Sequence, residues 1–165
     1  MKVFIALGSQ QFQLNRLLRE MDALIGQGIV QELEVFAQIG FSDYLPQYYP
    51  YKCFCSRDEY SRYIGDADLM IVHGGASTIM EGLRAGKRII VYPRKAAFHE
   101  HIDDHQLQIA QALEKKGYLL SCDGITLAEA IQKAADYDFQ SYTPVKSQIP
   151  ELLLGFIKGK RTDQM

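Results

Sequence analysis

The sequence predicts an α/β fold in which a parallel sheet is covered by helices on both faces. Short apolar runs alternate along the chain with segments of helical periodicity, as in proteins whose parallel strands are joined by crossover helices. Residues 69–72 are apolar at every position, which is the pattern of a strand buried on both faces. A chain of 165 residues with 47% hydrophobic content can bury the core that such a fold needs. The expected architecture is a single Rossmann-like domain.

The first half of the chain is expected to hold three strands and two helices in alternation. Strands are expected at residues 3–7, at 33–38 and, as a short element, at 51–55. Helices are expected at residues 15–26 and 57–65. The second half continues the same alternation from the buried strand at 69–72.

A helix is expected directly after that strand. Ile79 and Leu83 lie on one helical stripe with Gly86, and Gly86 suits the first position beyond the helix. A strand at 88–92, a helix at 104–116 and a strand at 118–122 follow. The last helix of this domain is expected at 127–135, with Thr126 as its N-cap.

A glycine turn joins the strand at 69–72 to its helix. Such a turn aims the free N–H groups of the helix start beyond the carboxyl end of the strand, where the helix dipole favours an anion such as a diphosphate. A Gly-Gly pair can also be only a tight connection. We expect Gly75 to let the backbone approach a ligand closely and to have a φ value that disfavours a β-branched residue. The turn consists of His73, Gly74, Gly75, Ala76, Ser77 and Thr78.

Glu81 follows this turn within the first turn and a half of the expected helix. Its carboxylate can project near the same pocket and accept both hydroxyls of a ribose. The alternative is a solvated helix residue near the positive end of the dipole, which satisfies the same physics.

Several motifs together carry a more specific signal. They are His73-Gly74-Gly75-Ala76-Ser77-Thr78-Ile79-Met80-Glu81, Gly86-Lys87, Pro93, Glu100-His101-Ile102-Asp103-Asp104-His105-Gln106 and Gly117-Tyr118-Leu119. This set resembles the C-terminal, donor-binding domain of family 28 glycosyltransferases, which is one half of a GT-B enzyme. The likeness covers about residues 1–135. It is strongest to small free-standing members, namely PssE-type exopolysaccharide and capsule subunits and the cytosolic subunit of the two-part dolichol-linked N-acetylglucosaminyltransferase.

The resemblance implies a role for each matching segment. The residues of the glycine turn would hold the diphosphate of a UDP-sugar, and Glu81 would hold its ribose. Gly8 and Ser9 match the family's first glycine loop, although Gly-Thr is more usual there. Phe54 and Cys55 would meet uracil, mainly through backbone atoms. The segment that would reach the hexose consists of His101, Asp103, Asp104, His105 and Gln106.

The resemblance also points to candidate catalytic residues, which are His73, Asp104 and His105, with His101 as a further candidate base. The base that deprotonates the acceptor hydroxyl is expected on a partner unless one of these histidines reaches that hydroxyl. Asp104 has a second possible role, because it could be the N-cap of the helix at 104–116.

No metal and no cofactor are expected at the donor site. The histidines and carboxylates of residues 99–105 could bind zinc or iron, but no common ligand spacing falls on a predicted helix. Asp66-Ala67-Asp68 looks like a metal motif but fits a helix end and strand start. Helix N–H groups, with Arg94 or Lys95, would supply the positive charge instead.

The cysteines predict neither a disulfide framework nor a zinc site. The three residues Cys53, Cys55 and Cys122 cannot all pair with one another, so a reduced cytoplasmic protein is the simpler interpretation. Cys53 and Cys55 form a C-x-C without a matching second half.

A partner is expected to supply the acceptor half of the active site. Transferases of this architecture use two domains, and residues 1–141 supply one. The expected partner is a membrane-anchored subunit that presents a polyprenyl-linked acceptor to the cytoplasm. Residues 142–165 are expected to be a linker, a short apolar helix near 150–157 and a charged tail. That helix could pack on its own sheet or dock the partner.

Other functions fit the sequence less well. No apolar run reaches the roughly 20 residues of a membrane span, and a net charge of −2 argues against a general nucleic-acid binder. The first turn, Gly8-Ser9-Gln10, lacks the G-x-G-x-x-G of nicotinamide-cofactor proteins. A non-catalytic UDP-binding or regulatory module would use the same glycine turn and remains open.

Overall fold

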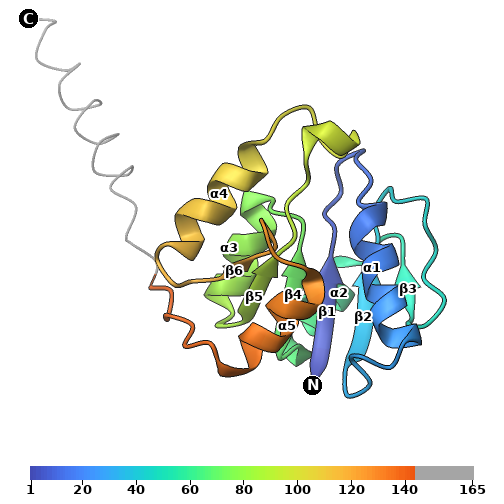
Figure 1. The fold of residues 1–165 in the computed structure, drawn as a ribbon, viewed down its shortest axis with the longest axis horizontal. Coiled ribbons are helices and arrows are strands. Elements are labelled where there is room, and N and C mark those ends of the chain that lie inside the picture. Colours follow the sequence, from blue (N-terminus) through green and yellow to red (C-terminus); the bar gives the residue numbers. More distant parts are fainter. Residues whose placement is uncertain (144–165) are drawn as a thin grey trace, which may run out of the picture.

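The computed structural model describes residues 1–143, which form a six-stranded parallel sheet with helices on both faces (Figure 1). The strand order is β3-β2-β1-β4-β5-β6, and every neighbouring pair is parallel. The strands are β1 (Lys2–Ala6), β2 (Glu34–Gln38), β3 (Tyr51–Lys52), β4 (Leu69–Val72), β5 (Arg88–Val91) and β6 (Leu120–Ser121). The helices are α1 (Asn15–Gly26), α2 (Arg57–Asp66), α3 (Ala76–Arg84), the 3₁₀ turn η1 (Ala96–Phe98), α4 (His105–Glu114) and α5 (Leu127–Asp136). The predicted fold class is confirmed.

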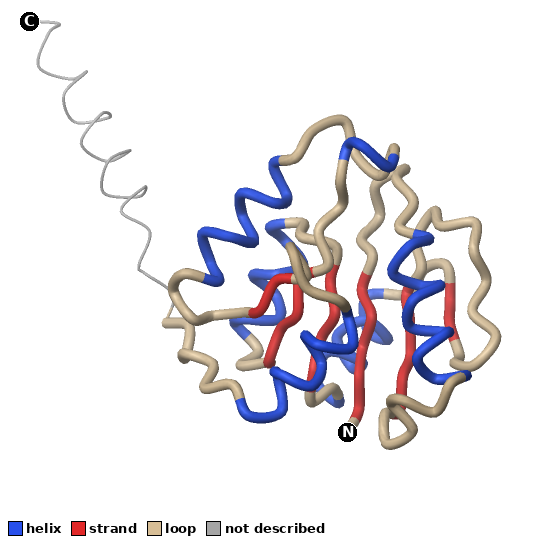
Figure 2. The backbone as a smooth tube through the Cα atoms, in the orientation of Figure 1, coloured by secondary structure: helices blue, strands red, loops and turns tan. Residues whose placement is uncertain are grey.

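Two apolar cores lie on opposite faces of this sheet. Side chains alternate along β1, so Val3 and Ile5 enter one core while Phe4 and Ala6 enter the other. Helices α1 and α5 close the first core and lie in front of the sheet in Figures 1 and 2. Helices α2, α3 and α4 close the second.

The strand order places a topological switch between β1 and β4. The chain builds β1, β2 and β3 toward one edge and then crosses to β4 on the other side of β1. Loops after β1 and β4 therefore leave the same end of the sheet in different directions. Ligands of open α/β sheets bind in the crevice at such a point.

The expected elements are present, with shifts at their ends. The helix at 15–26 and the strand at 69–72 have the predicted bounds. The strands expected at 51–55 and 118–122 keep only two residues each, because β3 and β6 are edge strands that pair with one neighbour. Thr126 is the N-cap of α5, as predicted, and forms a capping box with Glu129.

The structure also bears on three sequence features outside the site: the aspartates before β4, the cysteines and the membrane-span question. Asp66 ends α2, and Asp68 accepts a hydrogen bond from the Lys2 N–H before β4, which agrees with a helix-end and strand-start role. The three cysteines are free thiols. Within residues 1–143, no helix is long and apolar enough to cross a membrane. The apolar helix expected near 150–157 lies outside the described residues.

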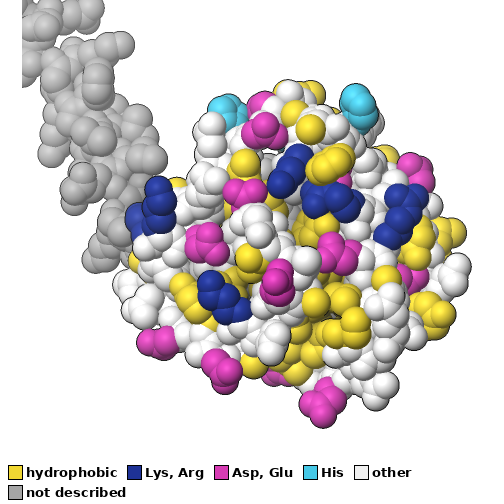
Figure 3. Space-filling view, viewed as in Figure 1, with side chains coloured by type: hydrophobic (Ala, Val, Ile, Leu, Met, Phe, Trp, Pro, Cys, Tyr) yellow, Lys and Arg dark blue, Asp and Glu magenta, His cyan; other side chains and the backbone are white. Residues whose placement is uncertain are grey.

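Charges of both signs are interspersed on the face that α1 and α5 cover. Figure 3 shows Lys and Arg side chains on this face dispersed among acidic and apolar ones. The positive charges of this face therefore do not gather into one patch.

Candidate functional site

A hollow of about 380 Å³ lies at the carboxyl ends of β1 and β4, at the topological switch. It is within the range of about 300–1,000 Å³ typical of small-molecule sites. The loop after β1, the turn after β4 and the start of α4 form its walls. Its lining consists of Gly8, Ser9, Gln10, His73, Gly74, Gly75, Ala76, Ser77, Thr78, His101, His105, Gln106 and Ile109.

The glycine turn leaves the start of α3 open to this hollow. Gly75 is the N-cap residue, and no side chain within residues 1–143 caps the helix. The first N–H groups of a helix have no intrahelical acceptor, so those of α3 are available to a ligand. Ala76, Ser77 and Thr78, the first three residues of α3, line the hollow. This end of α3 can therefore receive an anion.

Both glycines of the turn are required, for different reasons. Gly74 has φ +91°, a value that L side chains rarely adopt. Gly75 has φ −70°, so the expectation of an unfavourable φ there was wrong. A Cβ at Gly75 would lie 2.3 Å from Nε2 of His73, so a side chain there would force the ring or the turn to move.

His73 forms the floor between the two glycine loops. Its ring is buried, and a Cβ added at Gly8 would lie 2.8 Å from it. Nδ1 lies 3.2 Å from the carbonyl oxygen of Ala6, which can only accept, so Nδ1 carries the proton. Burial, followed by the nearby Arg94 charge, lowers the pKa of His73 to about 4. His73 is therefore neutral at pH 7 and adds no positive charge to the hollow.

His73 should make folding stability depend on pH. Its pKa falls from 6.5 to about 4 on folding. Between these pH values the histidine binds a proton in the unfolded chain but not in the folded protein, so lowering the pH favours unfolding. The contribution of His73 to the free energy of unfolding is fully present above pH 6.5 and is lost as the pH falls toward 4. The loss is about 3 kcal/mol, at about 1.36 kcal/mol per pKa unit. Urea unfolding of the parent and of His73→Gln across this window isolates the effect, because the other titrating groups are shared. Equal pH slopes for the two proteins would contradict the assignment.

The loop before α4 is held by two neighbouring aspartates. Asp103 accepts hydrogen bonds from Nδ1 of His101 (3.0 Å) and from the N–H of His105 (3.1 Å). The hydrogen bond from the His105 N–H is the main reason that the pKa of Asp103 is lowered. Asp104 occupies the N-cap position of α4, but its carboxylate accepts from the Ala96 N–H instead of capping the helix. Asp104 thus has the expected N-cap position without a side-chain cap, and Asp103 bonds the first N–H of the helix.

Gln106 lines the hollow and carries a buried acceptor without a partner among residues 1–143. The residue is 6% exposed, and its Oε1 has no hydrogen-bond partner within the described part of the chain. A Cβ at Gly74 would lie 3.3 Å from this oxygen, so the amide lies against the glycine turn. Buried polar atoms without a partner are rare in folded proteins. A ligand hydroxyl would satisfy it.

Some predicted site residues lie outside this lining. Phe54 is 45% exposed and packs edge-to-face on Phe41, and the N–H of Cys55 donates to Gln38. Glu81 is exposed on α3, close enough to Tyr60 that burial and then the Glu81 charge raise the pKa of that tyrosine to about 12. The predicted contacts of Phe54 and Cys55 with uracil, and of Glu81 with ribose, stay predictions.

Arg94 and Lys95 do not reach the hollow. Arg94 is fully buried, and its Nη2 donates to the carbonyl oxygen of Phe12 at 2.8 Å. Lys95 pairs with Asp123 at 3.4 Å. These two side chains therefore do not supply the positive charge that was predicted to balance the diphosphate. The start of α3 would have to supply it alone.

Metal ligands do not converge in the described residues. Within residues 1–143, no group of three or more His, Cys, Asp or Glu side chains could hold a metal ion. The histidine and aspartate side chains near α4 instead bond one another. Metal independence of the donor site stays a prediction.

The lining also includes two residues that the sequence did not single out as contacts. Gln10 belongs to the expected loop after β1, and Ile109 follows Gln106 by three positions on α4. Positions i and i+3 of a helix lie on one face, so Ile109 could have been predicted to line the hollow together with Gln106.

Glu81→Gln tests the ribose assignment. If the carboxylate accepts the two ribose hydroxyls, UDP binding should weaken by about 1.5 to 3 kcal/mol, the range for hydrogen bonds to a charged group. The residue is exposed, so the fold should be unaffected. Calorimetry with UDP measures the change, and unchanged affinity would remove Glu81 from the site.

The sheet topology, with its hollow at the switch point, defines a Rossmann-like α/β domain with the fold found in GT-B glycosyltransferases. The chain belongs to the glycosyltransferase family 28 C-terminal domain family, whose model matches residues 2–151.

Curated relatives agree with this family. The human UDP-N-acetylglucosamine transferase subunit ALG13 is 28% identical over 126 residues, which are 73% of this chain and 11% of that protein. The protein of the same name from Candida glabrata is 32% identical over 73 residues, 43% of this chain and 35% of that protein. The chain therefore spans a minor part of the length of these relatives.

Solved structures share the fold. A solution structure of ALG13 has a TM-score of 0.57 at 19% identity and covers 93% of this chain and 94% of its own. Acinetobacter baumannii MurG has a TM-score of 0.58 at 20% identity, over 86% of this chain and 43% of its own. At such identities the likeness concerns the fold alone.

Proposed function

We propose that this chain is the donor-binding part of a two-component, inverting glycosyltransferase that transfers a hexose from a UDP-sugar. The observation that carries the proposal is the hollow at the switch point, which is lined by the uncapped start of α3 and by Gln106, whose Oε1 has no partner in the described residues. The helix start suits a diphosphate, and the Gln106 amide suits a sugar hydroxyl. Family membership and the similarity to a UDP-N-acetylglucosamine transferase subunit support the same function.

The start of α3 would stabilise the leaving group. Displacement at the anomeric carbon places growing negative charge on the departing diphosphate. Preorganised N–H groups and a helix dipole stabilise such charge without reorganisation at the moment of reaction. His73 is neutral and fixed by Ala6, so its role is to shape the floor of the hollow. The proposal requires neither a metal nor a cofactor.

The general base is proposed to come from the partner, with two histidines of this chain as alternatives. His101 and His105 both line the hollow. Asp103 orients the first through its Nδ1, which leaves Nε2 to accept a proton, and the second has a side chain that is 73% exposed. Asp104 is held by Ala96 and is the weaker catalytic candidate.

The partner is proposed to be a membrane-anchored acceptor-binding subunit. It would present a polyprenyl-linked saccharide in bacterial exopolysaccharide or capsule synthesis, and this chain would be cytoplasmic and bound to the membrane through it. Support comes from the relative named as a transferase subunit and from the single domain that residues 1–143 form.

Gln106→Ala tests the hexose end of the site. Loss of the acceptor should lower affinity for a UDP-sugar by about 0.5–1.5 kcal/mol, the net worth of one hydrogen bond, while UDP binding stays nearly unchanged. Calorimetry with UDP, and with UDP-glucose, UDP-galactose, UDP-glucuronate and UDP-N-acetylglucosamine, measures both. Chelator should alter neither. An equal loss for UDP and the UDP-sugars, or stoichiometric zinc or iron lost together with binding, would contradict the assignment.

A further inference from the structure

An ion pair between a half-buried arginine and a buried glutamate joins α1 to the loop that enters the hollow. Glu100 is 1% exposed, and Arg16 from α1 donates to both of its carboxylate oxygens, Nε to Oε1 at 3.1 Å and Nη2 to Oε2 at 2.8 Å. The Lys95 N–H donates to Oε2 at 3.0 Å. Each carboxylate oxygen is thus engaged, and the two ends of residues 95–100 are tied together. Glu100 immediately precedes the segment 101–106.

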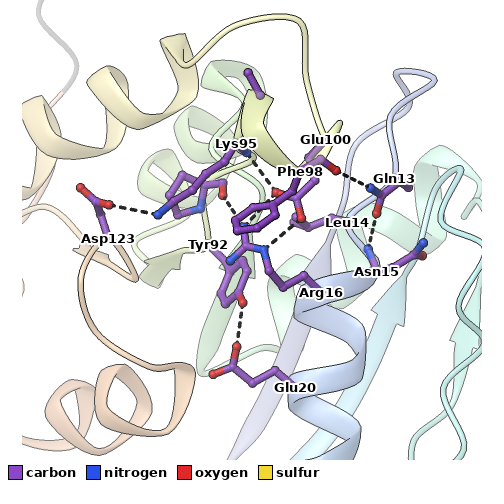
Figure 4. A network of polar contacts seen from close by, with 12 residues as sticks. Gln13, Leu14, Asn15, Arg16, Glu20, Tyr92, Lys95, Phe98, Glu100 and Asp123 are labelled. Atoms are coloured by element: carbon purple, nitrogen blue, oxygen red, sulfur yellow. Dashed lines mark hydrogen bonds and ion pairs between the residues drawn. The ribbon is translucent and has the colours of Figure 1, made fainter.

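Arg16 is itself fixed in place. Its guanidinium lies over the rings of Tyr92 (4.4 Å) and Phe98 (4.9 Å), and Nη2 also donates to the Pro93 carbonyl oxygen. Figure 4 shows Arg16 reaching from α1 between these groups. Planar stacking and two-pronged donation are properties of arginine that lysine lacks. Such a site restrains the loop in position and in orientation.

Further contacts join the same two segments. Gln13 donates to the Phe98 carbonyl oxygen, and the ring of Phe12 packs on His101 at 4.7 Å. From the loop after β5, Arg94 donates a hydrogen bond to the Phe12 carbonyl oxygen in the loop after β1. The loop after β1 and the loop after β5 are therefore held together, as their meeting at the top of Figure 1 also shows.

We infer that Arg16 and Glu100 are positioning residues that hold the segment 101–106 in register with the glycine turn. Neither lines the hollow, so neither would touch the ligand. The pair sets where His101 and Gln106 stand relative to α3. This inference rests on the proposed function only where it concerns the hexose, since positioning of the loop is a property of the unliganded protein. A misplacement of about 1 Å in such a segment can cost on the order of a hundredfold.

Two measurements on the full chain test the inference. In the unliganded protein, Arg16→Ala should raise amide hydrogen exchange in residues 101–110 by about tenfold or more, with little change in residues 74–84, because only the first segment loses its anchor. In calorimetry, the same variant should lose about tenfold in affinity for the UDP-sugar that the parent binds best, while UDP affinity changes less than about twofold. Arg16→Lys should fall between Ala and the parent, because it keeps the charge but loses the planar fork.

Lys95→Ala is the matched control. This substitution removes the partly exposed ion pair between Lys95 and Asp123, which belongs to the same loop. The contact of Lys95 with Glu100 is made by its backbone N–H and is kept. Its exchange pattern and both affinities should equal those of the parent.

Failure of the inference is distinguishable from failure of the proposed function. Unchanged exchange at 101–110 in Arg16→Ala, or exchange raised equally throughout the chain, would overturn the positioning role whatever the ligand. If the parent binds no UDP-sugar, the proposed function fails, and the exchange measurement still decides the role of the pair.

Discussion

Gly75→Val is expected to abolish diphosphate binding while the chain stays folded. A Cβ at this position would lie 2.3 Å from Nε2 and 2.9 Å from Cε1 of His73. His73 cannot retreat easily, because its Nδ1 is bonded to Ala6 and its ring is buried. Either the ring or the turn must move, and such overpacking costs about 1–3 kcal/mol of stability. A turn displaced by about 1 Å no longer presents its N–H groups correctly, so UDP affinity should fall by about a hundredfold. Uridine, which has no diphosphate, should lose much less.

Gly65→Val is the control for this substitution. Gly65 lies in α2, and a Cβ there would meet no atom of the described residues within 4 Å. UDP binding by this variant should match that of the parent. An equal loss of UDP and uridine binding in Gly75→Val, accompanied by lost helical circular dichroism, would indicate misfolding and would not support a phosphate site.

The second large effect is expected in catalysis: the purified chain should bind a UDP-sugar and transfer nothing efficiently. Transfer requires donor and acceptor held in line at roughly 3 to 3.5 Å, and such positioning is worth effective molarities of about 10⁵–10⁸ M. Residues 1–143 form one sheet with one hollow at its switch point, which serves the donor in this account. The acceptor surface would come from the membrane-anchored partner.

A radiolabelled UDP-sugar and a short polyprenyl-linked saccharide provide the assay. The chain alone should give background, and membranes containing the co-expressed partner should give transfer. Efficient transfer by the purified chain would defeat the two-component account. UDP binding without transfer in the presence of the partner would favour the non-catalytic binding module.

Local sequence patterns were enough to predict the elements that form the floor of the site. The strand at 69–72 is recognisable because all four residues are apolar, and Gly86 ends α3 with φ +67°, as its position predicted. Parallel topology then places the turns after β1 and β4 at one edge. The convergence on one hollow of residues 8–10 and 73–78 with His101, His105 and Gln106 was therefore predictable.

Features that depend on contacts between distant segments were not predictable. The clash that makes Gly75 necessary comes from the orientation of the His73 ring, which Ala6 fixes from 67 positions away. Arg16 and Glu100 are 84 positions apart, and no local pattern pairs them. Arg94 reads as a cation available to a phosphate, yet the loop after β1 covers it completely. Each of these depends on tertiary packing, which spacing along the chain does not encode.

The most direct measurement is a titration of the ¹⁵N-labelled chain with UDP, followed through its backbone amide signals. We expect saturable shifts concentrated at residues 8–9 and 74–78, where the loop after β1 and the open start of α3 line the hollow. The amides of α5, on the opposite face of the sheet, should remain in place. Absence of any saturable shift, or shifts largest on α5, would contradict the claim that this chain holds a nucleoside diphosphate at the switch point of its sheet.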